Sequence, residues 1–532
     1  TFDRLLYDII ALIGVDGKYD IVFKGLIECA HVVKLDVRLH QTFTDIPFKN
    51  QLSADHRSFY IKIVAADDDN DDRRFGSIGF GLYDYPWQQC HQKQKTNDRF
   101  LHIGHLPSSL YQRRMSKDTT NRFAIWHLYV IIESTLFTKH ITQEVSMQNF
   151  KFYAPTEIIF GKDQAEALPK VMAPYGKKVL LAYGKGSIKR NGIYDQIKEI
   201  LKDFEIIDFP DIEPNPHLAS VERGVGLCKQ HNVDMILAVG GGSVIDCAKV
   251  VAAGTFHDGD LWDLVMDSTL ITNALPLFSV LTLAGTGSEM NAGGVITNTK
   301  INVKKGVGHR KMIPIASVVD PTYLYSLPAY QTAAGSIDIF SHLCENYFKE
   351  EPHAFVQDRV SEALMKTVLF FAPMAIKEPD NYVARANLAW ASSLALNGIT
   401  GSGKPGAWPV HAIEHELSAY YDLTHGVGLA IITPVWMRYT LNDTNLYQYV
   451  EYGINVFGID PTLPKTEIAE KAIDATEAFF KSLGIPMSLK EVDIDETHFE
   501  AMAKSAVKLG RLDKAAIPLD EGDVIQILKQ CL

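Results

Sequence analysis

The chain has 532 residues, of which 46% are hydrophobic and 22% charged, and its formal net charge is −12. A chain of this length is too long for one ordinary domain and should fold as three or four compact units. Its negative charge gives no reason to expect nucleic acid or an anionic membrane as a partner, and no apolar run is long enough to span a bilayer. The six cysteines form no CxxC pair, so we expect a reducing, cytoplasmic setting without a disulfide framework.

Residues 1–146 differ in character from the rest and indicate an extra, β-rich module. β-like runs at 19–23, 31–39, 58–64 and 123–132 alternate with polar stretches. The acidic run at 67–72 lacks the ligand spacing, the central glycine and the distal glutamate of a calcium-binding EF-hand loop, which favours a solvated loop. The short basic stretch around Arg113 is interpreted as a solvated face. No chemistry or partner follows for this module.

From Met147 onward the pattern alternates short apolar strands with amphipathic helices. Strands are expected at 177–184, 205–209 and 234–242, and helices near 195–202 and 218–231. Strand and helix alternating at this spacing predict a parallel sheet with crossover helices.

A run of three glycines, 240–242, falls where a buried strand ends, and Ser243 opens the next helix. Glycines allow close approach of a diphosphate to the main chain, and a helix N-terminus adds partial positive charge. A plain tight turn would also explain the glycines. Their place between strand and helix favours a phosphate cradle, and a second turn rich in small residues, 281–294, supports that hypothesis.

From about Gln331 onward, long helical patterns replace the strands, for example at 355–371, 382–396, 468–483 and 497–508. The sequence therefore predicts an α/β domain followed by an all-α domain. A cleft between the two would place the nicotinamide end of a dinucleotide next to groups of the helical domain.

Histidines cluster in this helical part. His411 and His415 are i,i+4 neighbours on one helix face, and His425 directly precedes a glycine and an apolar run. Upstream, Asp338 and His342 are again i,i+4. Core or capping roles are the alternative, but carboxylate and imidazole together suit Fe(II), Zn(II), Mn(II) or Co(II).

Five motifs follow one another along the chain: GGGSVIDCAK, AGTGSEMNAGG, VVDPTYLYSLP, GSIDIFSH and HAIEHELSAYYDLTHG. In this order and spacing they resemble the iron-containing (group III) alcohol dehydrogenase family, most closely its butanol dehydrogenase and NADPH-dependent aldehyde reductase branch. The resemblance covers residues 147–532 and implies a dehydroquinate synthase-like fold, with a dinucleotide-binding domain at 147–329 and a metal-binding domain at 330–532. Since MQNFKFYAPTEIIFGK is similar to a family N-terminus, residues 1–146 are interpreted as an appended module.

The resemblance also implies a set of site residues. One divalent metal, Fe(II) or Zn(II), would be held by Asp338, His342, His411 and His425, with His415 as the catalytic proton route beside it. The positions carried over for the cofactor are Asn215, Gly241, Gly242, Ser243, Asp246, Thr282, Thr286 and Lys304. Gly184, Gly186 and Ser187 are further candidate cofactor positions at the end of the first strand, where this chain departs from many relatives. We expect NADP(H) to be preferred and NAD(H) to be possible, because the first strand ends in Gly-Lys-Gly-Ser without the aspartate of many NAD-preferring relatives.

The implied activity is hydride transfer between NAD(P)H and an aldehyde or primary alcohol by a homodimer. A polyol dehydrogenase of the same fold, acting on glycerol for example, is an alternative. A metallopeptidase is another, because 411–415 spells H-x-x-E-H with Glu414 as a general base. A binding or scaffold role conferred by residues 1–146 is a third.

Overall fold

The computed structural model of the protein describes residues 22–24, 35–40, 60–65, 148–349 and 353–532. The chain divides into two compact units, Thr1–Lys139 and His140–Leu532. In the first unit, β1 (Val22–Lys24), β2 (Leu35–His40) and β3 (Tyr60–Ala65) form an antiparallel sheet in the order β1-β2-β3. These strands overlap three of the four predicted runs. The fourth run, the acidic run and the basic stretch around Arg113 lie outside the described residues.

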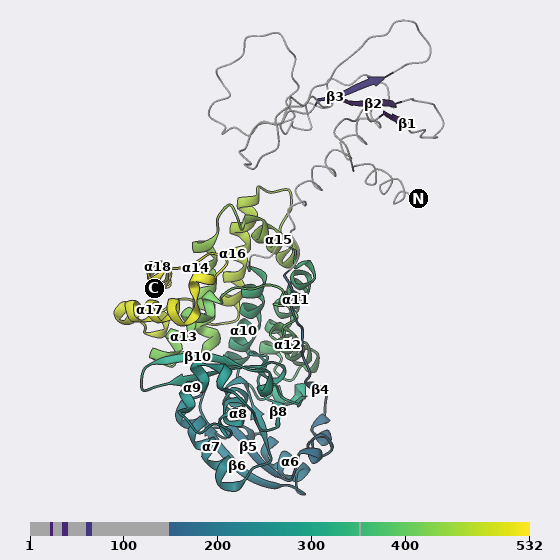
Figure 1. Cartoon of the computed structure of the whole chain (residues 1–532). Coiled ribbons are helices and arrows are strands. Elements are labelled where there is room, and N and C mark those ends of the chain that lie inside the picture. The colour runs from purple at the N-terminus through teal and green to yellow at the C-terminus, as the bar shows by residue number, and fades with distance from the viewer. Residues whose placement is uncertain (1–21, 25–34, 41–59, 66–147, 350–352) are drawn as a thin grey trace, which may run out of the picture. The chain divides into compact units, whose positions relative to one another are not determined.

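A six-stranded parallel sheet organises the first half of the second unit (Figure 1). Its order is β4-β11-β8-β7-β5-β6. The strands are β4 (Glu157–Phe160), β5 (Lys178–Gly184), β6 (Glu205–Ile212), β7 (Met235–Gly240), β8 (Leu277–Leu281) and β11 (Ala316–Val319). Every residue of β7 is buried, with Met235 and Leu237 in the core on one face and Ile236 and Ala238 in the core on the other. A strand apolar on both faces is typical of a parallel sheet covered by helices on both sides.

The connecting helices are α4 (Leu168–Met172), α5 (Ser187–Arg190), α6 (Ile193–Ile200), α7 (Leu218–His231), α8 (Gly242–Gly254) and α9 (Leu261–Met266). A two-stranded antiparallel hairpin, β9 (Gly293–Asn298) and β10 (Val303–Gly308), stands apart from this sheet. β10 contacts α13 of the helical part, so it carries residues of the α/β half across to the helices.

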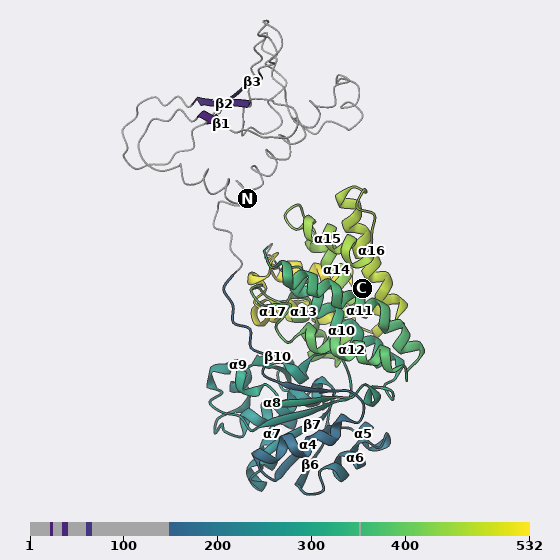
Figure 2. The same cartoon turned by 90° about the vertical axis from the view of Figure 1, so that its right-hand side faces the viewer.

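Helices alone make up the rest of the described chain, which has no strand after Val319 (Figure 2). They are α10 (Ala329–Tyr347), α11 (Phe355–Lys377), α12 (Tyr382–Ala395), α13 (Pro409–Tyr421), α14 (His425–Thr440), α15 (Leu446–Phe457), α16 (Lys465–Ser482), α17 (Phe499–Gly510) and α18 (Glu521–Gln530). Among the helices described, we find none with the length and apolar character needed to cross a membrane. The predicted order of an α/β part followed by a helical part is confirmed.

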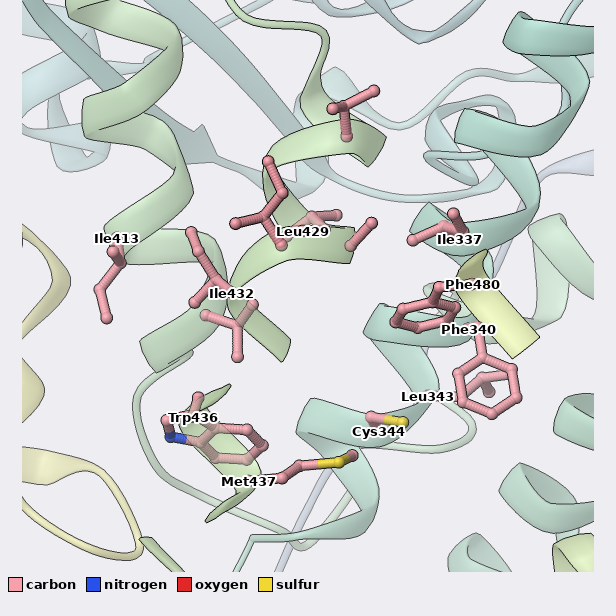
Figure 3. Packing of buried hydrophobic residues seen from close by; sticks show 14 of the residues in the cluster. Ile337, Phe340, Leu343, Cys344, Ile413, Leu429, Ile432, Trp436, Met437 and Phe480 are labelled. Carbon is pink, nitrogen blue, oxygen red and sulfur yellow. The ribbon is translucent and has the colours of Figure 1, made fainter. Parts of the chain in front are cut away.

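One part of the core of the helical part forms where α10 and α14 meet α16 (Figure 3). The ring of Phe340 lies edge-on to that of Phe480, with 5.6 Å between centroids, and α14 contributes buried Leu429 and Ile432. At the start of α14, a Cβ on Gly426 would lie only 2.1 Å from the carbonyl oxygen of Ala334. Only glycine fits this approach, which fixes the first turn of α14 against α10.

Candidate active site

The glycine run forms the turn between β7 and α8. A Cβ on Gly242 would lie 2.4 Å from the Thr286 hydroxyl oxygen, and a Cβ on Gly241 would lie 2.9 Å from Leu283. No described side chain caps the N-terminus of α8, which leaves backbone N–H groups of its first turn free. These groups lie at a cavity of about 430 Å³, lined in part by Gly241, Gly242 and Ser243. The turn has the geometry of an anion-binding cradle.

The second small-residue turn joins the two halves of this unit. The backbone N–H of Gly285 donates to the Ser392 hydroxyl at 2.9 Å. A Cβ on Gly335 of α10 would lie 2.2 Å from the carbonyl oxygen of Ala284, and a Cβ on Gly285 would lie 3.1 Å from a carboxylate oxygen of Asp338. The absence of side chains at both glycines brings the turn directly against α10, beside Asp338.

Beneath the cradle lies a buried ionic network that the sequence analysis missed. The fully buried Lys249 ammonium donates to Ser288 Oγ at 2.8 Å, Asn291 Oδ1 at 2.9 Å and the Gly293 carbonyl at 2.6 Å. The Asp246 carboxylate accepts from Ser288 Oγ at 2.5 Å and from a backbone N–H of β9. Burial lowers the pKa of Lys249 to about 8 and raises that of Asp246. Asp246 is thus held in place beside the cradle by these contacts. In the sequence, the sign of this network was Lys249, a lysine that follows Asp246 by one turn in an otherwise apolar helix.

The predicted metal ligands converge from three helices. Asp338 and His342 lie on α10, His411 lies on α13, and His425 is the first residue of α14. Asp338 Oδ1 lies 3.5 Å from His342 Nδ1, 3.8 Å from His411 Nε2 and 3.7 Å from His425 Nε2. Asp338, His411 and His425 each offer a ligand atom within 4.8 Å of the others. His342 is outside that closest set, and its ring stacks on His411 at 4.6 Å between centroids.

The polar atoms at this point lack partners within the described part of the chain. Asp338 Oδ1, His342 Nδ1 and His411 Nε2 are all buried without a hydrogen bond. Each such atom costs roughly 1–3 kcal/mol, which a coordinated cation would offset. Burial lowers the pKa of His342 to about 4. Burial alone would raise the pKa of Asp338, but His342 and the other imidazoles outweigh it and lower that pKa to about 2. Asp338 is therefore ionised and His342 neutral, which are the forms in which these side chains bind a divalent metal, whereas His411 must release a proton when a metal binds.

Two further carboxylates contact the other ring nitrogens of the histidines. Glu345 on α10 contacts His411 Nδ1 and accepts the backbone N–H of Val410 at 2.8 Å. Burial works to lower the pKa of His411, but Glu345 and Asp338 outweigh it and raise that pKa to about 9. Glu345 was not among the predicted site residues, although it lies at i+7 from Asp338 on the helix face that also carries His342.

Glu414 on α13 is fully buried and contacts His425 Nδ1 and the Ser418 hydroxyl, with Lys304 Nζ 3.4 Å away. A general base of a peptidase must reach a water molecule, and this carboxylate is instead enclosed by protein donors. The H-x-x-E-H spacing therefore gives no support to the metallopeptidase alternative.

One cavity of about 620 Å³ brings the two predicted halves of the site together. The predicted residues that line this cavity are Asn215, Ser243, Asp246, Thr286, Lys304, His342, His411, His415 and His425. The adjoining cavity of about 430 Å³ adds Gly184, Gly241, Gly242 and Asp338. Gly186, Ser187 and Thr282 line neither cavity. Trp408 and Met290 line the larger cavity and were not predicted.

A phosphate cradle on a parallel sheet, opening onto an aspartate and histidine cluster in a helical domain, defines a metal-dependent dinucleotide enzyme. The chain belongs to the iron-containing alcohol dehydrogenase family. The family models "Iron-containing alcohol dehydrogenase" and "Fe-containing alcohol dehydrogenase family, C-terminal" match residues 155–321 and 332–532. The resemblance stated from the motifs is confirmed.

Individual relatives agree with this assignment. NADH-dependent butanol dehydrogenase A of Clostridium acetobutylicum is 49% identical over 387 residues, which are 72% of this chain and all of that protein. The NADPH-dependent aldehyde reductase YqhD of Escherichia coli is 37% identical over 68% of this chain and 94% of its own length. The crystal structure of NADH-dependent butanol dehydrogenase A from Thermotoga maritima has a TM-score of 0.70 at 38% identity, and covers 72% of this chain and 99% of that one.

Proposed function

We propose that this chain is a metal-dependent oxidoreductase that transfers hydride between NAD(P)H and aldehydes or primary alcohols, in the manner of a butanol dehydrogenase. The observation that carries the proposal is the shared cavity, in which the cradle residue Ser243 and the histidine cluster line the same space. We assign cofactor binding to residues 147–329 and metal binding to residues 330–532. Residues 1–146 form an appended module to which we assign no role.

We assign one divalent metal, Fe(II) from the family or Zn(II) from the ligand types, to Asp338, His342, His411 and His425. When bound, the metal supplies Lewis-acid polarisation of a carbonyl oxygen and the nicotinamide supplies the hydride. In the overall reaction, an aldehyde, NAD(P)H and one proton give an alcohol and NAD(P)⁺.

The protein's own part is to position groups, exclude water and move that proton. His415 lines the cavity, its ring lies 5.7 Å from that of His425, and burial holds its pKa well below the usual range. We assign the proton transfer to a ring nitrogen of His415. Trp408 lies edge-on over His342 and His411, at 5.8 and 5.3 Å between centroids, and shields both from solvent.

For the cofactor we propose a preference for NADPH, although the relatives include both NADH- and NADPH-dependent enzymes. Lys185 lines the cavity at the end of β5. Glu213 also lines it, but its carboxylate accepts the His217 backbone N–H at 2.6 Å and the Ser220 hydroxyl at 2.8 Å. Lys189 is turned toward the Tyr183 ring, at 4.9 Å, and adds little to the preference. A charge-assisted contact to the 2′-phosphate contributes on the order of 1–3 kcal/mol.

The test is oxidation of NADPH and of NADH with butanal, on protein stripped of metal and reloaded with Fe(II) or Zn(II). We expect turnover that depends on metal, with the higher kcat/KM for NADPH. Absence of turnover with both cofactors on the reloaded protein would refute the proposal. A panel containing glycerol and 1,3-propanediol decides between the butanol-type and the polyol reading, because a polyol enzyme would turn these over faster than butanol.

A homodimer and a cytoplasmic location complete the proposal as predictions from the sequence. Light scattering on the purified protein measures the first, and a mass near twice 59.3 kDa is the expected result.

A further inference from the structure

Lys304 and Glu414 meet between the two proposed binding sites and belong to different parts of the fold. Lys304 lies on β10 of the α/β half, and Glu414 lies on α13 of the helical half. Their side chains are 5% and 0% exposed, and Lys304 Nζ lies 3.4 Å from Glu414 Oε2. Two opposite charges this deeply buried interact more strongly than a surface pair, because little water screens them.

The same oxygen of Glu414 also contacts a proposed metal ligand. Oε2 contacts His425 Nδ1, while Oε1 accepts the hydroxyl of Ser418. With Nδ1–H directed at the carboxylate, the Nε2 lone pair of His425 points toward Asp338, 3.7 Å away. A Cβ on Gly428 would lie 2.7 Å from Glu414 Cγ, so a glycine in α14 makes room for this arrangement.

Lys304 in turn connects to a proposed cofactor residue. Its Nζ donates to Asn215 Oδ1 at 3.0 Å, and Asn215 Nδ2 donates to Asp422 Oδ1 at 2.8 Å. Lys304 and Asn215 line the cavity together with Ser243 of the cradle. Contacts therefore run from the wall of the cofactor cavity through Lys304 to His425, both by way of Glu414 and directly, since Lys304 Nζ lies 3.5 Å from His425 Nδ1.

We propose that Glu414 is a positioning residue that couples the metal site to the nicotinamide cofactor, so that binding of each raises the affinity for the other. The inference rests on the proposed function. Glu414 Oε2 is shared by two donors, Lys304 and His425. When a bound cofactor draws Lys304 away, that oxygen is left to His425 alone, which strengthens its hold on Nδ1 and makes Nε2 a better ligand. Reciprocal linkage requires the opposite effect, of metal on cofactor, to be equally large.

Glu345 provides a matched control, since it contacts His411 Nδ1 as Glu414 contacts His425 but has no described contact with Lys304. Both Glu345→Gln and Glu414→Gln should weaken metal binding by roughly 10- to 100-fold, as loss of such outer partners typically does. Only Glu414→Gln should also remove the coupling. Lys304→Met should remove the coupling while affecting the metal affinity less than either glutamate variant does.

The experiment measures dissociation constants of NADPH and NADH by cofactor fluorescence on metal-free protein and on protein saturated with Co²⁺. Co²⁺ affinity is followed by its visible absorption, which also reports ligand geometry. We expect a ratio of cofactor dissociation constants, without over with Co²⁺, of roughly 5 to 150 in the wild type, the usual range for coupled sites. The ratio should persist in Glu345→Gln and fall close to one in Glu414→Gln and Lys304→Met.

The competing explanation of a ratio above one is direct attraction between the metal and the cofactor phosphates, which none of these substitutions would remove. A ratio equally large in Glu345→Gln and Glu414→Gln would therefore overturn the proposal. A wild-type ratio of one also overturns it. Circular dichroism checks that each variant is folded. If Glu414→Gln does not fold, Gly428→Ala replaces it, because a Cβ at this position crowds Glu414 without removing its charge. The ratio must then also fall in Gly428→Ala. Failure of the wild type to bind Co²⁺ or either cofactor would instead refute the proposed function itself.

Discussion

Glu416 lies one residue beyond His415 on α13 and carries a titratable group in an unfavourable place. Its side chain is buried, at 2% exposed, and lines another cavity, of about 750 Å³, which His411 and His415 also line. Ser505 Oγ donates to its Oε1 at 2.7 Å, while Oε2 has no partner among the described residues. Burial raises the pKa of Glu416 from 4.5 to about 7, the nearby Glu414 adds to the rise, and the Ser505 hydroxyl opposes it.

The sign of the effect on stability follows from this direction. Above pH 4.5 the unfolded chain releases the proton of Glu416, whereas the folded protein retains it until about pH 7. The free energy of unfolding therefore falls as the pH rises from about 4.5 to about 7. At about 1.36 kcal/mol per pKa unit, the loss completed above pH 7 is about 3 kcal/mol, of which about 2–3 kcal/mol lies between pH 5 and pH 8.

Glu416→Gln should remove this pH dependence. The amide can still accept the Ser505 hydroxyl, and any cost of its buried NH₂ group is the same at each pH. The measured quantity is the melting temperature of the variant minus that of the wild type. This difference should rise by roughly 5–10 °C between pH 5 and pH 8, at about 2–4 °C per kcal/mol for a domain of the size of residues 330–532. Differential scanning calorimetry at equal metal content measures it.

Glu470→Gln on the exposed side of α16 is the control and should leave the difference unchanged between the two pH values. The reasoning is refuted if the Glu416→Gln difference is also the same at pH 5 and pH 8.

Four other predictions concern the ligands, the domains, the cofactor and the packing. His425→Ala should lose bound metal, measured by mass spectrometry, and activity while its far-ultraviolet circular dichroism is retained; full metal content would contradict the ligand assignment. A shortened chain beginning at Met147 should retain the kcat/KM of the full chain, and an insoluble or inactive product would count against an autonomous enzyme. Lys185→Asp should shift the kcat/KM ratio of NADPH over NADH toward NADH by roughly 5- to 150-fold, and an unmoved ratio would contradict the role of Lys185. Gly224→Ala should destabilise by about 1–3 kcal/mol in thermal unfolding, because its Cβ would lie 2.6 Å from Val251. A Cβ on Gly226 in the same helix would meet no described atom within 4 Å, so Gly226→Ala should stabilise by about 0.5–1 kcal/mol, and equal effects of the two substitutions would contradict this prediction.

The elements were predictable wherever the apolar pattern had one clear period. The helix expected at 218–231 is α7, Leu218–His231, and the strand expected at 177–184 is β5, Lys178–Gly184. Elements whose ends depend on tertiary contacts were less accurate. The strand expected at 205–209 continues to Ile212 as β6, because β5 extends its pairing across an irregularity between Ala182 and Gly184. Pairing of this kind leaves no signal in the strand's own sequence.

The candidate ligands were predictable for a similar reason, since Asp338 and His342 lie one turn apart on a single helix. Their partners were not. Lys304 and Glu414 are 110 positions apart and meet only because β10 packs on α13. The sequence named both residues, but in unrelated roles, as a cofactor contact and as a possible peptidase base. Their contact in the structure is the basis for proposing that both residues couple the metal site to the cofactor site.

Glycine is the common reason that residues so far apart in the chain can share a site. Gly335 and Gly426 let the turn at Ala284 and the start of α14 lie against α10, where Cβ atoms would come within 2.2 and 2.1 Å of carbonyl oxygens. Gly428 admits the side chain of Glu414 at a distance that no Cβ would allow. Adding one methyl group at Gly335 or Gly426 must separate helices or move a turn, because backbone atoms cannot rotate aside as a flexible side chain can, and at Gly428 it must displace the side chain of Glu414. The closeness of the cradle, the carboxylates and the histidines therefore depends on positions that carry no reactive group.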